Sequence, residues 1–275
     1  MLQLVCVILL MSTGFAEPSK ELDIPYGPHG DKNQLDLYLP AQKPFATIFL
    51  TYGGGRHGGS RKSMTPIAEY FQKLGYACVI ISHRLTPPDV FPSHIEDVAA
   101  AFAWVHKNIA GKGGDPKRII VMGHSSGAHL SLLLGADQQY LAKHGLKPSD
   151  IAGIVGLSTP TELRPQPDKK GYSDVLLAGR GADAFSKNVE HLKQASPIVH
   201  LSKPMPPTML VVGERDFPML ANDAKAFAAQ AKALGMEVPV LITPKKDHMG
   251  NIRQLLEEPT EVTKQIIAFV ERCVK

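Results

Sequence analysis

Short apolar runs alternate with longer amphipathic segments along most of the chain. The short runs are rich in Val, Ile and Leu, which is typical of strands that are covered on both faces. Strands are predicted at residues 35–39, 45–52, 76–82, 119–122, 151–157, 208–212 and 238–242. The longer segments repeat apolar residues at helical spacing. Helices are predicted at residues 64–73, 95–109, 128–134, 221–234 and 260–270.

This alternation of strands and helices predicts an α/β fold with a mostly parallel central sheet and helices on both faces. No internal repeat is visible, so residues 17–275 are expected to form a single domain. Residues 160–196 break the rhythm, because they are polar, contain several Pro and Gly, and show no clear period. Long irregular segments of this kind are often functional lids, and we expect a small cap inserted over the top of the sheet.

The first sixteen residues carry no charged side chain and are mostly apolar. Gly14 and Ala16 supply small residues before a cleavage point, and the first acid, Glu17, follows at once. This pattern predicts a secretory signal peptide over residues 1–16, with an uncleaved anchor or a misassigned start as the alternatives. The apolar stretch is shorter than the roughly 20 residues that span a bilayer. We therefore expect a secreted or periplasmic protein whose mature chain has no stable membrane insertion.

Composition excludes several classes of protein. The chain has 275 residues, of which 44% are hydrophobic, and its net charge is +4. Intrinsic disorder is therefore excluded, and the scattered Lys and Arg residues predict no nucleic-acid surface. Three cysteines in a chain of this length exclude a disulfide scaffold. We expect Cys78 and Cys273 to be separate thiols, since Cys78 lies in a predicted buried strand, although an oxidising compartment would permit a bridge.

A candidate nucleophile lies where a predicted strand runs into a predicted helix. Gly123-His-Ser-Ser-Gly127 follows the strand at 119–122 directly. A sharp turn here would project the hydroxyl of Ser125, and the two glycines would leave the space that the turn requires. The same turn would place the Ser126 N–H at a helix N-terminus, where it can face an anion. The alternative is a strand-to-helix turn with an idle serine.

A glycine-rich loop, Gly53-Gly-Gly-Arg-His-Gly-Gly59, follows the predicted strand at 45–52. Glycines after a strand suit a backbone that must offer N–H groups to a developing oxyanion. We therefore expect Gly53 and Gly54 to be oxyanion donors together with Ser126. A phosphate-binding loop is excluded, because the Lys-Ser/Thr ending of that motif is missing. A merely flexible loop is the alternative.

These segments resemble the α/β-hydrolase serine esterases. Gly123-His-Ser-Ser-Gly-Ala-His-Leu130 is similar to the nucleophile segment of secreted bacterial xylan- and feruloyl-esterase-like carboxylesterases and of arylformamidases. The resemblance extends from residue 35 to His248 and implies the α/β-hydrolase fold. The chain departs from the family pattern twice. Tyr52 stands where the family usually has the His of His-Gly-Gly-Gly, and His83 stands where Tyr is common in Tyr-Arg-Leu-x-Pro.

The resemblance also implies an acid and a base, in the chain order Ser, Asp or Glu, and His. Asp216 matches the family's Gly-x-x-Asp pattern after the strand at 208–212, with Glu214 as the nearby competitor. Of the eleven histidines, only His248 follows both the acid and the last predicted strand. The expected catalytic residues are therefore Ser125, Asp216 and His248.

Taken together, the residues predict a serine carboxylesterase that hydrolyses small acyl or aryl esters through an acyl-enzyme. Its expected partner is a small-molecule ester, and the histidines and cysteines show no metal-ligand cluster, so neither a metal nor a cofactor is expected. The same residues equally permit an amidase or formamidase of this fold. An inactive binding protein on this scaffold is the alternative from another class.

Overall fold

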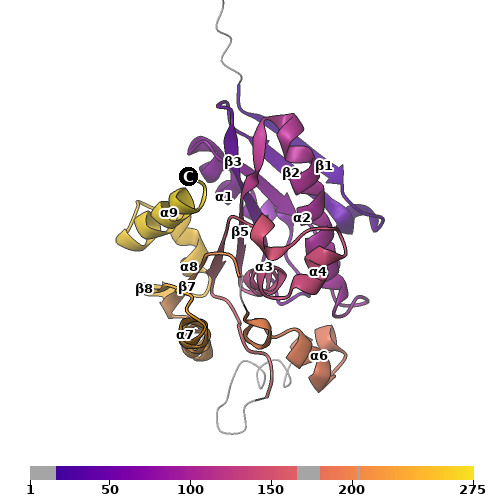
Figure 1. Ribbon diagram of the computed structural model, residues 1–275, viewed down its shortest axis with the longest axis vertical. Helices are drawn as coiled ribbons and strands as arrows, with labels where there is room; N and C mark the ends of the chain where they lie inside the picture. The colour runs from indigo at the N-terminus through magenta and orange to yellow at the C-terminus, as the bar shows by residue number, and fades with distance from the viewer. Residues whose placement is uncertain (1–16, 166–179, 203–204) are drawn as a thin grey trace, which may run out of the picture.

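One eight-stranded sheet organises the residues that the computed structural model describes, which are 17–165, 180–202 and 205–275 (Figure 1). The strand order is β1-β2-β4-β3-β5-β6-β7-β8. The strands are β1 (Ser19–Pro25), β2 (Gln34–Leu39), β3 (Phe45–Thr51), β4 (Ala77–Ile81), β5 (Gly114–His124), β6 (Gly153–Leu157), β7 (Thr208–Arg215) and β8 (Val240–Asp247). β3 to β8 are parallel, whereas β2 pairs antiparallel with both β1 and β4. The mostly parallel sheet that the sequence predicts is thus confirmed.

Helices cover both faces of this sheet, as predicted. Along β4, Ala77, Val79 and Ile81 face one apolar core, while Cys78 and Ile80 face the other. This two-residue alternation lets a strand that is apolar throughout contribute to both cores. The first core is closed by α2 (Ser93–Lys112), α3 (Ser126–Ala136) and α7 (Pro218–Ala233), and the second by α1 (Arg61–Lys73) and α9 (Glu261–Cys273). Shorter helices are α4 (Gln138–Ala142), α6 (Val189–Gln194) and α8 (Gly250–Arg253).

The largest differences from the prediction are at two strand boundaries and in one whole strand. β5 begins at Gly114, five residues before its predicted start at 119. β8 continues to Asp247, five residues beyond its predicted end. β1 was not predicted because most of its side chains are exposed and polar, so it has no apolar pattern. It forms because an edge strand needs only one backbone partner, here β2.

The predicted cap at 160–196 falls partly outside the described residues. Within its described part, Phe185 and Leu192 are buried in the first core, and the Phe91 N–H donates to the Ala184 carbonyl at 2.7 Å. Phe185 ends a 3-10 turn, η3 (Arg180–Phe185), and Leu192 lies in α6. The predicted signal peptide, residues 1–16, lies outside the described residues altogether. Cys78 and Cys273 are both free, as expected.

No helix within residues 17–165, 180–202 and 205–275 combines the length and the apolar character that crossing a membrane requires.

The turn from β5 into α3 is packed tightly against the end of β3. A Cβ at Gly127 would lie 2.3 Å from the carbonyl oxygens of Thr51 and Tyr52. Backbone atoms cannot move aside as a flexible side chain can, so glycine is required at this contact.

Replacing Gly127 with Ala should therefore destabilise the fold strongly, by more than about 2 kcal/mol, because β3 and α3 must separate. Urea unfolding followed by circular dichroism measures this loss. Gly111→Ala is the matched control, since a Cβ there meets no atom within 4 Å and the residue is helical. That control should change the free energy of unfolding by less than about 1 kcal/mol, in the stabilising direction. Equal effects of the two substitutions would contradict the packing described.

Candidate active site

The candidate residues lie where parallel strands end at the same edge of the sheet. Ser125 follows β5, Asp216 follows β7 and His248 follows β8, while Gly53 comes shortly after β3. Ligands bind at the carboxyl ends of the strands in open α/β sheets. The parallel pairing of β3, β5, β6, β7 and β8 brings these four residues to that edge.

Ser125, His248 and Asp216 form one continuous line of hydrogen bonds. His248 Nε2 lies 2.9 Å from Ser125 Oγ, and His248 Nδ1 lies 2.7 Å from Asp216 Oδ1. With a proton on Nδ1, the imidazole donates to the carboxylate and presents Nε2 as an acceptor for the serine hydroxyl. This arrangement can activate a serine oxygen as a nucleophile and stabilise the imidazolium that forms.

The backbone of Ser125 adopts a conformation that favours glycine, with φ 55° and ψ −124°. A residue with a side chain is held in such a region at a cost of order 1–3 kcal/mol. Two backbone hydrogen bonds hold it there: the Ser125 N–H donates to Leu157 O, and the Ser125 carbonyl accepts from the His129 N–H, both at 2.9 Å. The turn therefore directs the hydroxyl out of the strand end and toward His248.

The carboxylate of Asp216 is fully buried and accepts several hydrogen bonds. The Ser158 hydroxyl donates to Oδ2, while His248 Nδ1–H and the Phe217 N–H donate to Oδ1. Burial alone would raise the pKa of Asp216, but the bonds from His248 and Ser158 outweigh it and hold that pKa below its ordinary value. The competing acid, Glu214, is exposed and accepts from the Lys245 N–H at 2.7 Å, so it takes no part in the line.

Ser158 and Asn251 are two supporting residues that the sequence reasoning missed. Ser158 directly follows β6, the strand between those that carry Ser125 and Asp216, and it is fully buried with φ 55°. Asn251 Nδ2 donates to Ser158 Oγ at 2.8 Å and to Val211 O at 2.9 Å. The amide thus orients the hydroxyl that holds the acid. The sequence signal that could have identified Ser158 is a hydroxyl residue directly after the predicted strand at 151–157.

His124 contacts His248 on another side. Its Nε2 lies 2.8 Å from the His248 carbonyl oxygen, and the two imidazole centroids are 4.8 Å apart. Burial and, to a smaller extent, the charge of a protonated His248 lower the pKa of His124 to about 4. His124 is therefore neutral at pH 7 and donates its Nε2 proton to that carbonyl. This bond ties the loop that carries His248 to the strand that runs into Ser125.

The three predicted oxyanion donors, Gly53, Gly54 and Ser126, occupy different positions around Ser125. A Cβ on Gly53 would lie 2.9 Å from Ser125 Cβ, so this backbone runs directly beside Ser125. Ser126 is the first residue of α3, where an N–H has no acceptor within the helix. Gly54, with φ 133°, begins the turn of the loop, and its carbonyl accepts from the N–H groups of His57 and Gly58.

The two departures from the family pattern contact each other. The rings of Tyr52 and His83 stack with centroids 4.8 Å apart and planes 23° apart, and the His83 N–H donates to the Tyr52 hydroxyl at 3.4 Å. Burial lowers the pKa of His83 to about 4, so the stacked imidazole is neutral at pH 7. A Cβ on Gly59 would lie 2.5 Å from the Tyr52 ring, so this ring supports the glycine loop directly.

Buried Arg56 connects the glycine loop to the helix behind the nucleophile. Its Nη2 donates to His129 Nδ1 at 2.8 Å, and its guanidinium stacks over the Phe185 ring at 4.7 Å. Burial, together with the charge of Arg56, holds the pKa of His129 well below its ordinary value. His129 is thus a neutral acceptor at Nδ1, and its Nε2–H donates to the Ala195 carbonyl at 2.6 Å.

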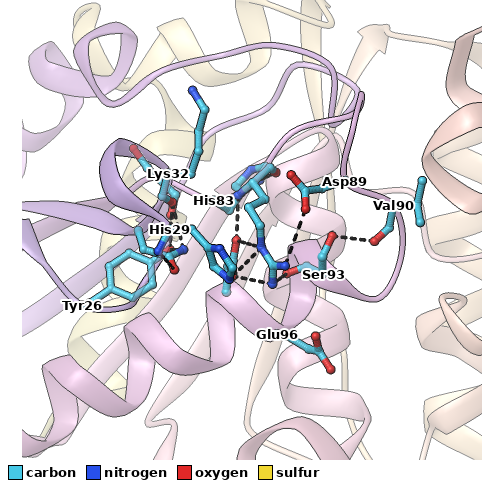
Figure 2. Close-up of polar contacts among 12 residues, drawn as sticks. Tyr26, His29, Lys32, His83, Asp89, Val90, Ser93 and Glu96 are labelled. Carbon is cyan, nitrogen blue, oxygen red and sulfur yellow. Dashed lines mark hydrogen bonds and ion pairs between the residues drawn. The ribbon is translucent and has the colours of Figure 1, made fainter.

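The segment after β4 is anchored by a second arginine (Figure 2). Arg84 donates hydrogen bonds to the Asp97 carboxylate from its side chain and from its backbone N–H. Its Nη1 also lies 3.6 Å from Asp89 Oδ1. The Thr86 N–H then donates to the Arg56 carbonyl at 2.8 Å. The glycine loop is therefore attached to the start of α2 as well as to α3. Across the described ranges, the structure brings no three His, Cys, Asp or Glu side chains together as metal ligands.

Comparisons with known proteins agree with this architecture. A model of the family described as BD-FAE matches residues 35–230. Esterase LipQ of Mycobacterium tuberculosis is 32% identical over 232 residues, which cover 78% of this chain and 53% of LipQ. Isoprenylcysteine alpha-carbonyl methylesterase ICME of Arabidopsis thaliana is 28% identical over 274 residues, covering 90% of this chain and 62% of ICME. The chain thus spans about half the length of the curated relatives it matches.

Among solved structures, a truncated form of a carbohydrate esterase from gut microbiota superposes with a TM-score of 0.79 at 21% identity. The match covers 95% of this chain and 98% of that one. A likeness at this level of identity concerns the fold. It confirms the α/β-hydrolase fold that the resemblance implied.

Removing the Ser158 hydroxyl should make stability less dependent on the ionised acid. The folded-state pKa of Asp216 lies below its ordinary value of 3.8, so its contribution is present above about pH 4 and is lost as the pH falls through the folded-state pKa. Ser158→Ala should lower the free energy of unfolding by about 1–3 kcal/mol at pH 7. The difference from the unmodified protein should shrink as the pH approaches 3.

Urea unfolding between pH 7 and pH 3 measures this dependence. Ser131→Ala is the matched control, because that buried hydroxyl bonds only a backbone carbonyl, Met122 O, at 3.3 Å. Its effect should be small and the same at every pH. A Ser158→Ala effect of constant size across the range would contradict the role assigned to this hydroxyl.

Proposed function

Because the chain belongs to the BD-FAE family of α/β-hydrolase serine esterases, we propose that it hydrolyses carboxylic esters of small molecules. The observation that carries the proposal is the hydrogen-bonded line from Ser125 through His248 to Asp216, beside the glycine loop. The names of two relatives, an esterase and a methylesterase, support the same bond type. Ser125 is the proposed nucleophile, His248 the base and Asp216 the residue that orients it.

The reaction proceeds in two halves. His248 Nε2 accepts the Ser125 hydroxyl proton as Oγ attacks the ester carbonyl carbon, and the carbonyl oxygen becomes an oxyanion. Backbone N–H groups of Gly53, Gly54 and Ser126 are the proposed donors to this oxyanion. The intermediate then expels the alcohol, which takes the proton from His248. Water attacks the acyl-enzyme with His248 again as base, and the acid leaves with Ser125 restored.

Small acyl or aryl esters are the proposed substrates. Two half-exposed apolar side chains lie next to His248 and favour an apolar substrate at the rim of the site: Phe217 contacts its ring, and Met249 follows it in the sequence. We further propose that the protein acts outside the cytoplasm, as a secreted or periplasmic enzyme. The support for this location is the uncharged, apolar run of residues 1–16 that ends at Ala16.

Replacing Ser125 with Ala should lower kcat/KM for p-nitrophenyl acetate by at least about 10⁴-fold, because the nucleophilic oxygen is gone. Release of p-nitrophenolate measures the rate. Circular dichroism and thermal melting of the same variant show whether its fold is intact. A fluorophosphonate should label the unmodified protein and not the variant. An inactive binding protein on this scaffold would show neither hydrolysis nor labelling.

The amidase alternative is tested by a pair of substrates that share the acetyl group and the aryl ring. We expect the ratio of the hydrolysis rates of p-nitrophenyl acetate and p-nitroacetanilide to be at least as large as the ratio of their rates in water, where the ester is already much the more reactive. An anilide must be protonated at nitrogen before it can leave, so an amidase holds its general acid close to that nitrogen. Hydrolysis of the anilide at the rate of the ester would favour the amidase, and N-formylkynurenine would then be the next substrate to assay.

A further inference from the structure

One exposed aromatic side chain lies directly against the proposed base. The Phe217 ring centroid is 4.6 Å from that of His248, and the two planes are 45° apart. The side chain is 49% exposed, so one part of the ring contacts the imidazole and another part faces solvent. Among the large exposed apolar side chains of the described residues, Phe217 is the one aromatic.

The position of the leaving group follows from the chemistry of His248. The imidazole returns its proton through Nε2, so the ester oxygen that leaves must come within hydrogen-bond distance of Nε2. A substituent on that oxygen then lies beside the imidazole and within contact distance of a ring packed on it. The acyl group lies elsewhere, because its carbonyl oxygen must face the N–H groups near Gly53 and Ser126. The exposed part of Phe217 therefore borders the alcohol portion of the ester.

The backbone at Phe217 is fixed before any substrate arrives. Its N–H donates to Asp216 Oδ1 at 2.8 Å, and Pro218 begins α7 immediately after it. A residue before proline is disfavoured in the helical region, and Phe217 lies outside that region with φ −54° and ψ 126°. Little conformational freedom of the backbone is then lost when a ligand contacts the ring. The N–H to Asp216 comes from the backbone, so it survives any non-proline substitution of the side chain.

We propose that Phe217 forms the leaving-group subsite and gives the enzyme a preference for esters whose alcohol carries an aromatic ring. The proposal rests on the proposed esterase function. Aromatic pairs in offset or edge-to-face geometry gain stability beyond the area that they bury. An aliphatic alcohol of similar size would bury apolar area on Phe217 but would not gain this additional term.

Benzyl acetate and butyl acetate test this subsite, because both release a primary alcohol and form the same acetyl-enzyme. Phe217→Ala should lower the ratio of kcat/KM for benzyl acetate to that for butyl acetate by roughly three- to tenfold. Phe217→Tyr keeps the ring and should retain the ratio, whereas Phe217→Leu keeps apolar bulk and should lose it. Leu74→Ala, at a similarly exposed apolar residue directly after α1, should leave the ratio unchanged.

A second readout separates leaving-group binding from a general effect on His248. The alcohol has departed before the acetyl-enzyme breaks down, so Phe217→Ala should leave the deacylation rate unchanged in rapid-quench experiments with p-nitrophenyl acetate. Equal losses on both acetates, or slower deacylation, would overturn the leaving-group role, because the ring would then act only through the imidazole. Absence of hydrolysis and of fluorophosphonate labelling in the unmodified protein would instead contradict the esterase function itself.

Discussion

The turn between β5 and α3 is the constraint around which the site is arranged. Ser125 occupies a backbone region that favours glycine, and its hydroxyl is presented because the strand reverses into a helix there. The turn is possible only because Gly127 lets the helix approach the backbone at the end of β3. The parallel sheet keeps Ser125 in this conformation, because the Ser125 N–H donates a hydrogen bond to the Leu157 carbonyl at the end of β6. The stability of the sheet thus offsets the cost of this conformation.

Burial and buried hydrogen bonds determine which side chains near the site are charged. Ser158, oriented by Asn251, helps to keep the Asp216 carboxylate ionised, in spite of burial that would otherwise raise its pKa. Burial has the opposite consequence for three imidazoles near the site, His83, His124 and His129, whose pKa values it lowers. These histidines are neutral at pH 7 and act as hydrogen-bonding or stacking groups. A positive charge on His248 therefore meets an anion on one side and no competing imidazolium on the other.

Sequence reasoning reached the parts of this arrangement that leave a local pattern. Apolar runs alternating with amphipathic segments indicated the sheet, and Ser125, Asp216 and His248 each follow a predicted strand in the expected chain order. The missed features depend on contacts between distant segments. Ser158 reaches Asp216 only because β6 lies between β5 and β7 in the sheet. β1 has no apolar pattern in the sequence, because a polar edge strand can form by pairing with β2 alone. The stacking of Tyr52 on His83 joins residues from two strand ends, so two separate departures from the family pattern turn out to be one contact.

During hydrolysis the hydroxyl of Ser125 is expected to carry the acyl group. Mass spectrometry of the protein, quenched in acid within milliseconds of mixing with p-nitrophenyl acetate, tests this most directly. An acetyl group should appear on the peptide that contains Ser125 at the rate of the nitrophenolate burst and disappear at the rate of steady turnover. Turnover with no acetylated peptide, or acetylation at any other residue on that timescale, would show that Ser125 is not the nucleophile.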